Sequence, residues 1–103
     1  MTLYYYISAS KQFLLEEEPV EEILRERLKF YQTNHLSVDF WLIQDTSLTK
    51  IPELSSLQND FKRDIAAIIS TNSCFIDWLK LRLQYVFIGS FETEESFIAD
   101  TIQ

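Results

Sequence analysis

Residues 73–91, SCFIDWLKLRLQYVFIGSF, combine a dense run of apolar side chains with a cation that lies among them. At about 100° per residue, one stripe of apolar side chains predicts a helix that packs on a sheet. Trp78, Leu81 and Tyr85 widen the apolar arc beyond that contact, and Arg82 falls inside it. Such a cation needs either an internal carboxylate or a partner protein, since Arg, Trp and Tyr are enriched at binding hot spots. The inward stripe consists of Phe75, Ile76, Leu79, Leu83 and Val86.

The length and composition of the chain predict one folded domain over residues 1–103, with 47% hydrophobic and 15% aromatic residues. A net charge of −7 argues against nucleic acid or an anionic membrane surface as a partner and favours a basic protein surface. Cys74 is the single cysteine, which excludes an internal disulfide and indicates a reducing compartment. Since no apolar run reaches ~18 residues and no basic signal-peptide start is present, we expect a soluble protein made where it acts.

Apolar alternation and helical spacing divide the chain into strands and helices. Both faces of strand 3–9 are apolar, with Tyr4 and Tyr6 on one of them, so we expect an inner strand. Residues 10–15 are expected to be a linker, and residues 93–103 a loosely held tail. The expected order is strand 3–9, helix 16–34, strand 37–44, a loop with one short helix in 45–62, strand 65–69, a helix from residue 73 and strand 86–91.

This order of elements predicts an α+β two-layer sandwich, a ferredoxin-like plait. Two right-handed βαβ units would place both main helices on one face of a four-stranded antiparallel sheet, with the short helix as an insertion. The face that carries Tyr4 and Tyr6 or their neighbours would be open unless the insertion, the tail or a second chain covers it. No turn residue separates the last helix from the last strand near Tyr85.

The residues that catalysis or metal binding would need are scarce. His35 is the single histidine and follows a predicted helix end, and Gly89 is the single glycine, so neither a histidine-rich metal site nor a phosphate-binding glycine loop can be built. We therefore expect no catalytic residue, no metal ligand and no cofactor-binding residue. The chain is expected not to be an enzyme.

Asp39 is the single charge of its predicted strand and shares a face with Trp41 and Ile43. Three roles are open to it: a structural carboxylate paired with Arg82, a contact to a partner, or a general acid or base in an apolar setting. Arg82 has the corresponding alternatives. Trp78, Leu81 and Tyr85 are either core residues beneath the tail or part of an interface.

Several segments of the chain resemble a known family in their order and spacing. The segments are YYYISASKQFLLEEEPVEEILRERLKFY, DFWLIQ, IPEL, STNSCFIDWLKLRLQYV and GSFE, which span most of residues 3–92. They resemble the small plastid and cyanobacterial subunit associated with the oxygen-dependent magnesium-protoporphyrin IX monomethyl ester cyclase of chlorophyll synthesis. Residues 45–50 and the tail depart from the family pattern.

The resemblance implies a non-catalytic accessory subunit that supports assembly, stability or activity of the membrane-associated di-iron cyclase subunit. Carried over by position, the family's docking surface falls on Asp39, Phe40 and Arg82, which Trp78 and Leu81 would flank. The partner would be the di-iron subunit, and contact with the membrane would be indirect. The expected location is the cyanobacterial cytoplasm at the thylakoid surface or the chloroplast stroma, with the chain encoded in a cyanobacterium or a plastid.

Two other functions are compatible with the residues. One is a tetrapyrrole-binding or delivery module, in which the open sheet face and its tyrosines hold the porphyrin ring. The other is a small plait enzyme that acts as a homodimer with Asp39 as the base.

Overall fold

The computed structural model describes residues 2–44, 51–60 and 64–93. Their strands and helices follow the predicted order, with one additional π-helical turn. In chain order they are β1 (Thr2–Ser10), η1 (Phe13–Glu17), α1 (Val20–Thr33), β2 (Phe40–Gln44), α2 (Pro52–Asp60), β3 (Ile65–Ser70), α3 (Ser73–Leu83) and β4 (Phe87–Thr93).

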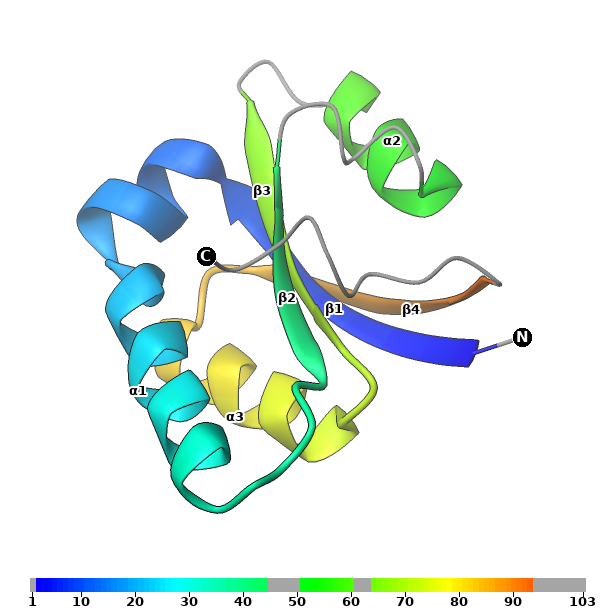
Figure 1. Cartoon of the computed structure of the whole chain (residues 1–103). Coiled ribbons are helices and arrows are strands. Elements are labelled where there is room, and N and C mark those ends of the chain that lie inside the picture. Colours follow the sequence, from blue (N-terminus) through cyan, green and yellow to red (C-terminus); the bar gives the residue numbers. More distant parts are fainter. Residues whose placement is uncertain (1, 45–50, 61–63, 94–103) are drawn as a thin grey trace.

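The strands form one four-stranded sheet in the order β2-β3-β1-β4, and every pair of neighbours is antiparallel. β1 is an inner strand, in which Tyr6 lies opposite Ile69 of β3 and opposite Gly89 of β4. α1 and α3 lie on one face of this sheet, whereas α2 lies on the other (Figure 1). The predicted α+β sandwich with an inserted short helix is therefore confirmed.

The sheet separates two hydrophobic cores. β3 is buried along its whole length, with Ala66 and Ile68 facing α1 and α3, and Ile65, Ala67 and Ile69 facing α2. This alternation follows from the two-residue period of a strand. The continuous apolar run of this strand thus reflects cover on both faces.

Aromatic rings fill part of the α2 face. The ring of Tyr4 stacks on that of Phe91 at 5.5 Å between centroids and meets that of Trp41 edge-on at 5.9 Å. Tyr6 lies so close to β4 that a Cβ on Gly89 would come within 2.6 Å of the tyrosine oxygen. Burial raises the pKa of Tyr4, and burial followed by the charge of Glu53 raises that of Tyr6. The insertion therefore covers the face that carries these tyrosines, as one of the three expected alternatives.

The segment between β1 and α1 differs from the predicted linker. Apolar residues draw it into the helix-side core, where Leu14 is fully buried, and it forms η1. The backbone N–H of Phe13 donates to Ser10 Oγ at 3.1 Å, and that of Glu18 donates to the Phe13 carbonyl at 2.8 Å. α1 starts only after Pro19, which lies at its N-cap position.

The second strand begins at Phe40, three residues later than predicted. Residues 37–39 lie outside the strand, although the Asp39 carbonyl still accepts hydrogen bonds from Ser70 Oγ at 2.7 Å and from the Thr71 backbone N–H at 3.1 Å. The Asp39 side chain is hydrogen-bonded to Tyr31 of α1, whereas Trp41 and Ile43 pack in the core on the α2 side. Asp39 therefore does not share a face with them, and that part of the prediction is wrong.

The passage from α3 to β4 is made by a γ-turn. α3 begins at the N-cap Asn72, whose side chain accepts hydrogen bonds from the backbone N–H groups of Cys74 and Phe75. It ends at Leu83, after which Gln84 adopts φ 68° and ψ −54°, and the N–H of Tyr85 donates to the Leu83 carbonyl at 2.8 Å. Of the predicted tail 93–103, only Thr93 lies among the described residues, as the last residue of β4.

Candidate protein-docking site

The predicted docking residues lie on and beneath the helical side of the molecule. Asp39 is half-buried just before β2, and Arg82 is exposed on α3. Trp78 and Leu81, also on α3, expose 49% and 75% of their surfaces. Phe40 is fully buried, at 0% exposure. Four of the five side chains can therefore contact a partner, while Phe40 supports the site from the core.

The helical periodicity predicted that Arg82 lies among apolar side chains. In the structure it is not enclosed by them. It is exposed, and its guanidinium carbon lies 5.9 Å from the ring centroid of Trp78. Within the described part of the chain, Arg82 and Asp39 make no ion pair with each other. The structural pairing of these two residues, one of the alternatives for each, is therefore absent from this structure.

Arg27 on α1 lies against three aromatic rings. Its guanidinium carbon lies 3.8 Å from the ring centroid of Phe75, 5.1 Å from that of Tyr31 and 5.8 Å from that of Phe40. Its Nη2 donates a hydrogen bond to the Tyr31 hydroxyl at 2.9 Å. Its buried Nε has no hydrogen-bond partner among the described residues. We call Arg27, Tyr31, Phe40 and Phe75 the Arg27 cluster.

The Tyr31 hydroxyl links this cluster to Asp39, since it donates a hydrogen bond to Oδ1 of that carboxylate at 2.8 Å. Burial is the main cause that raises the pKa of Tyr31, and the hydrogen bond and charge of Asp39 raise it further, while Arg27 acts in the opposite direction. The phenol is therefore protonated at neutral pH and is available as the donor.

A row of aromatic rings runs from Asp39 toward Arg82. The Tyr31 and Phe40 centroids lie 5.4 Å apart and those of Phe40 and Phe75 lie 5.5 Å apart, both pairs edge-to-face. The Phe75 ring then stacks with that of Trp78 at 6.2 Å, and Trp78 contacts Arg82. The two charged residues are thus connected through packed side chains of α1, β2 and α3, although they do not touch.

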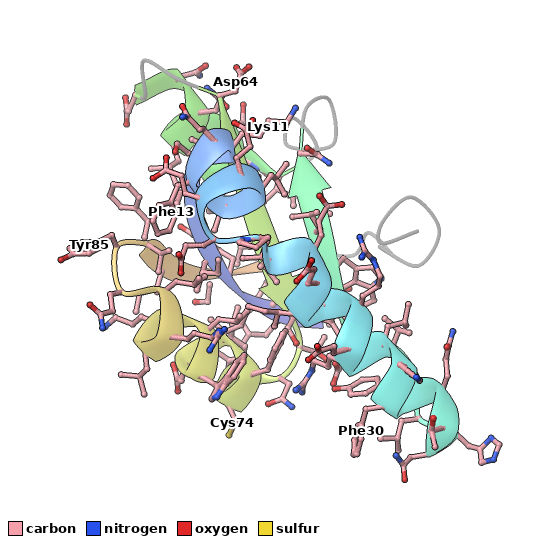
Figure 2. The ribbon with its side chains drawn as sticks, turned by 90° about the vertical axis from the view of Figure 1, so that its left-hand side faces the viewer. Lys11, Phe13, Phe30, Asp64, Cys74 and Tyr85 are labelled. Atoms are coloured by element: carbon pink, nitrogen blue, oxygen red, sulfur yellow. The ribbon has the colours of Figure 1, made fainter. Side chains whose placement is uncertain are left out.

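The outward side of α3 carries large apolar side chains in addition to charged ones. Phe75, Ile76, Leu79 and Leu83 are buried, as their spacing predicts. Trp78, Leu81 and Tyr85 are instead exposed, Tyr85 by 82%, so they do not belong to the core, while residues 94–103 of the predicted tail lie outside the described residues. In Figure 2, Tyr85 lies just beyond the end of α3 and points away from the helices. We call Trp78, Leu81 and Arg82, together with Tyr85 just beyond the helix end, the outer stripe of α3.

Further exposed apolar side chains lie near Asp39 at the end of α1 and in the following loop. They are Phe30, Leu36 and Val38, which were not predicted to belong to the site. Phe30 lies at the C-terminal end of α1 in Figure 2. A signal for these residues was present in the sequence. Phe30 is apolar but does not belong to the buried stripe of α1, and Leu36 and Val38 are apolar in the segment between α1 and β2.

The described residues include no group of three or more His, Cys, Asp or Glu side chains that could hold a metal ion. Among the described residues, the α2 side of the sheet is not an open face lined by tyrosines, because Tyr4 is buried and Tyr6 packs over Gly89. The surface needed for the tetrapyrrole-binding alternative is therefore not present in the described part of that face. In residues 2–44, 51–60 and 64–93, no helix is sufficiently long and apolar to cross a bilayer.

Comparison with known proteins identifies related sequences. Residues 2–93 match the profile of the family described as "Ycf54 protein". An uncharacterized protein ycf54 of Pyropia yezoensis is 52% identical over 92 residues, which cover 89% of this chain and 83% of the relative. A Ycf54-like protein of Synechocystis sp. is 43% identical over 99% of this chain and 77% of its own length. A chloroplastic protein YCF54 of Arabidopsis thaliana is 38% identical over 88% of this chain and 43% of its own length.

Solved structures have the same fold. The All0216 protein of Nostoc sp. PCC 7120 superimposes with a TM-score of 0.80 at 43% identity, covering 99% of this chain and 94% of that one. The Ycf54 protein of Synechocystis sp. PCC 6803 gives a TM-score of 0.79 at 42% identity, covering 100% of this chain and 96% of that one. The relatives thus include both chloroplastic and cyanobacterial proteins.

Proposed function

The chain belongs to the Ycf54 family, and from this membership we propose that it is a non-catalytic accessory subunit of the oxygen-dependent magnesium-protoporphyrin IX monomethyl ester cyclase. In this role it binds and supports the membrane-associated di-iron subunit during chlorophyll synthesis, and the oxygen chemistry belongs to that partner. The support for this partner is the resemblance of the sequence to the cyclase-associated subunit.

The observation that carries a binding role is the outer stripe of α3. Trp78, Leu81 and Arg82 lie there at helical spacing and are exposed, on a helix whose opposite side is already packed, and the exposed Tyr85 follows just beyond the helix end. Large apolar side chains that are exposed together on a protein surface are typical of an interaction site. Trp, Tyr and Arg are also the residues in which interfaces concentrate their binding energy. A partner that covers this stripe would satisfy both tendencies.

The charged residues give this surface an orientation. Asp39 and Arg82 carry opposite charges at two separate places on the same side of the molecule, and the row of aromatic rings holds them relative to each other. Separate charges of opposite sign contribute specificity and register to an interface more than affinity. The proposed docking surface therefore comprises Asp39, Arg82, Trp78 and Leu81, with Phe40 fixing its base.

The test is affinity capture of the di-iron subunit from a chlorophyll-making cell with tagged wild-type protein and Arg82→Ala. Removal of a hot-spot arginine is expected to weaken capture by about tenfold or more. Lys80→Ala is the matched control, because it removes an exposed cation from the same helix outside the stripe. Circular dichroism first establishes that each variant is folded.

Three outcomes are informative. Strong capture by wild type and Lys80→Ala with weak capture by Arg82→Ala supports the partner and the surface together. Equal capture by all three proteins would show that Arg82 does not belong to the interface. No capture of the di-iron subunit by the wild-type protein overturns the proposed function.

The proposed location follows from the same partner. Chloroplastic and cyanobacterial relatives support a plastid or cyanobacterial setting. We propose that the protein lies in the stroma or cytoplasm beside the thylakoid surface and contacts the membrane only through the di-iron subunit. Cell fractionation with and without that subunit tests this, because the membrane-associated fraction is expected to disappear when the subunit is missing.

A further inference from the structure

We propose that Arg27 and Tyr31 are positioning residues that hold the Asp39 carboxylate in one orientation for the docking partner. The inference rests on the proposed function in so far as Asp39 belongs to the docking surface. Neither residue needs to touch the partner. Each acts through Asp39, and their effect on binding is expected to disappear when that carboxylate is removed.

Arg27 is held in place by contacts with both helices. Its side chain starts on α1 and its guanidinium lies over the ring of Phe75 on α3, at 3.8 Å from the centroid. The two helices lie side by side on the same face of the sheet, with their side chains meeting between them (Figure 2). The contact fixes the guanidinium against a ring that is itself buried, so the position of Nη2 is set by both helices.

The hydrogen bonds from Arg27 to Tyr31 and from Tyr31 to Asp39 can run in one direction only. A guanidinium can only donate, so the bond between Arg27 Nη2 and the Tyr31 hydroxyl occupies the tyrosine oxygen as an acceptor. The hydroxyl hydrogen is then left to donate to Asp39 Oδ1. The reverse arrangement is not possible while the carboxylate is ionised, because it has no hydrogen to give. The order Arg27 to Tyr31 to Asp39 is therefore fixed by chemistry as well as by distance.

One carboxylate oxygen of Asp39 is available to a partner. Its backbone carbonyl is held from the β3–α3 side by Ser70 Oγ and the Thr71 N–H, and its Oδ1 is held from α1 by Tyr31. Within the described part of the chain, Oδ2 accepts no hydrogen bond. The residue thus presents one free carboxylate oxygen in a defined direction. A group held in this way loses little conformational freedom when it binds, which favours association with a basic or hydrogen-bond-donating partner group.

The decisive measurement without a partner is the side-chain rotamer of Asp39 in solution. Three-bond couplings between its Hα and Hβ protons report whether one χ1 rotamer or several are populated. We expect one rotamer in the wild-type protein and averaged couplings in Tyr31→Phe, which removes only the hydroxyl. Tyr5→Phe is the matched control, because this half-buried tyrosine has no hydrogen bond to Asp39. Averaged couplings in the wild type, or unchanged couplings in Tyr31→Phe, would overturn the inference.

The measurement with a partner is a double-mutant cycle on binding to the di-iron subunit. Tyr31→Phe is expected to weaken binding about threefold to tenfold, and Asp39→Asn to weaken it at least as much. The double variant is expected to bind like Asp39→Asn alone, because the hydroxyl acts only through the carboxylate. Fully additive losses would show that Tyr31 acts independently of Asp39 and would overturn the positioning role. Arg27→Gln is expected to behave as Tyr31→Phe does.

The two measurements separate the inference from the proposed function. If Asp39 has one rotamer that is lost in Tyr31→Phe, the positioning role is supported. If Asp39→Asn binds the di-iron subunit as the wild type does, Asp39 does not belong to the docking surface. Absence of any binding by the wild type rejects the proposed partner, and the rotamer data then decide the positioning role alone.

Discussion

Tyr31 is the residue at which the core, a carboxylate and a guanidinium meet. Its ring packs edge-on against Phe40, and its hydroxyl accepts from Arg27 and donates to Asp39. Burial and Asp39 favour the neutral phenol, whereas Arg27 favours the phenolate. The net result is a raised pKa, so the residue titrates only in alkaline solution.

The titration of Tyr31 should respond to its two neighbours in opposite directions. Asp39→Asn removes a negative charge and is expected to lower the pKa of Tyr31, while Arg27→Gln removes a positive charge and is expected to raise it. The measurement is a pH titration by NMR of tyrosine labelled with ¹³C at Cζ, with the Tyr31 resonance assigned by its loss in Tyr31→Phe. A pKa that does not change in Asp39→Asn would contradict the hydrogen bond.

The same shift makes stability depend on pH. A group whose pKa is higher in the folded protein than its unfolded value of about 10 contributes stability below that pH and loses it as the pH rises through the folded value. The raised pKa values of Tyr4, Tyr6 and Tyr31 all act in this direction. The free energy of unfolding should therefore fall above about pH 10, and less steeply in Tyr31→Phe.

Among the elements, α3 carries both the packing and the proposed docking surface, and it ends in an unusual way. Gln84 has φ 68° and ψ −54°, the conformation of the central residue of a γ-turn, which is strained for residues with a side chain. The turn persists because Leu83 is anchored in the core on one side and β4 pairs with β1 on the other. Local strain here is offset by the packing of both flanking elements.

Replacement of Gln84 by glycine is expected to stabilise the protein. Glycine has no Cβ and adopts positive φ at little steric cost, although its unfolded chain is more flexible, so the net gain should be about 1 kcal/mol. Urea denaturation of Gln84→Gly and wild type measures this difference. Gln12→Gly is the control. Residue 12 is exposed and has a φ of −60°, so glycine at this position is expected to destabilise the protein. Equal destabilisation of both variants would show that Gln84 is not strained.

Much of the element structure followed from periodicity. The inward stripe of α3, the two faces of β1 and the full burial of β3 each correspond to a regular spacing of apolar residues, because core packing selects those spacings. The γ-turn did not follow, since Gln84 carries no turn signal and its conformation is imposed by the elements on either side. The π-helical turn was not predicted either, although it places Leu14 in the core.

The site was predictable only in part. Asp39 and Arg82 stood out as charges among apolar residues, yet Arg82 is exposed and Asp39 lies outside the strand. Arg27 occupies a position inside the buried stripe of α1, three residues after Leu24 and four before Tyr31, which was an available signal. Its role nevertheless depends on Phe75 and Asp39, which belong to other parts of the chain. Contacts between distant segments are not encoded in local spacing.

At the scale of the whole molecule, the sheet separates the proposed docking surface from one of the two hydrophobic cores. One face carries α1, α3 and the docking surface, and the other carries α2 and a core of its own (Figure 1). A domain of this size is stable by only about 5–15 kcal/mol, so loss of either core is costly. A change on the α2 face should nevertheless leave the docking surface in place, because β3 and β1 lie between them.

A pair of leucine variants tests this separation. Leu54 on α2 is fully buried and Leu81 on α3 is 75% exposed, so the same truncation to alanine meets opposite surroundings. Leu54→Ala is expected to lower the free energy of unfolding by roughly 2–5 kcal/mol, whereas Leu81→Ala should change it by no more than about 0.5 kcal/mol. Capture of the di-iron subunit at a temperature where both variants are folded should show the reverse order, with Leu81→Ala weakened and Leu54→Ala close to wild type. If Leu54→Ala lost stability and capture together, the two faces would be coupled, and the partner would contact the α2 side or sense it through the sheet.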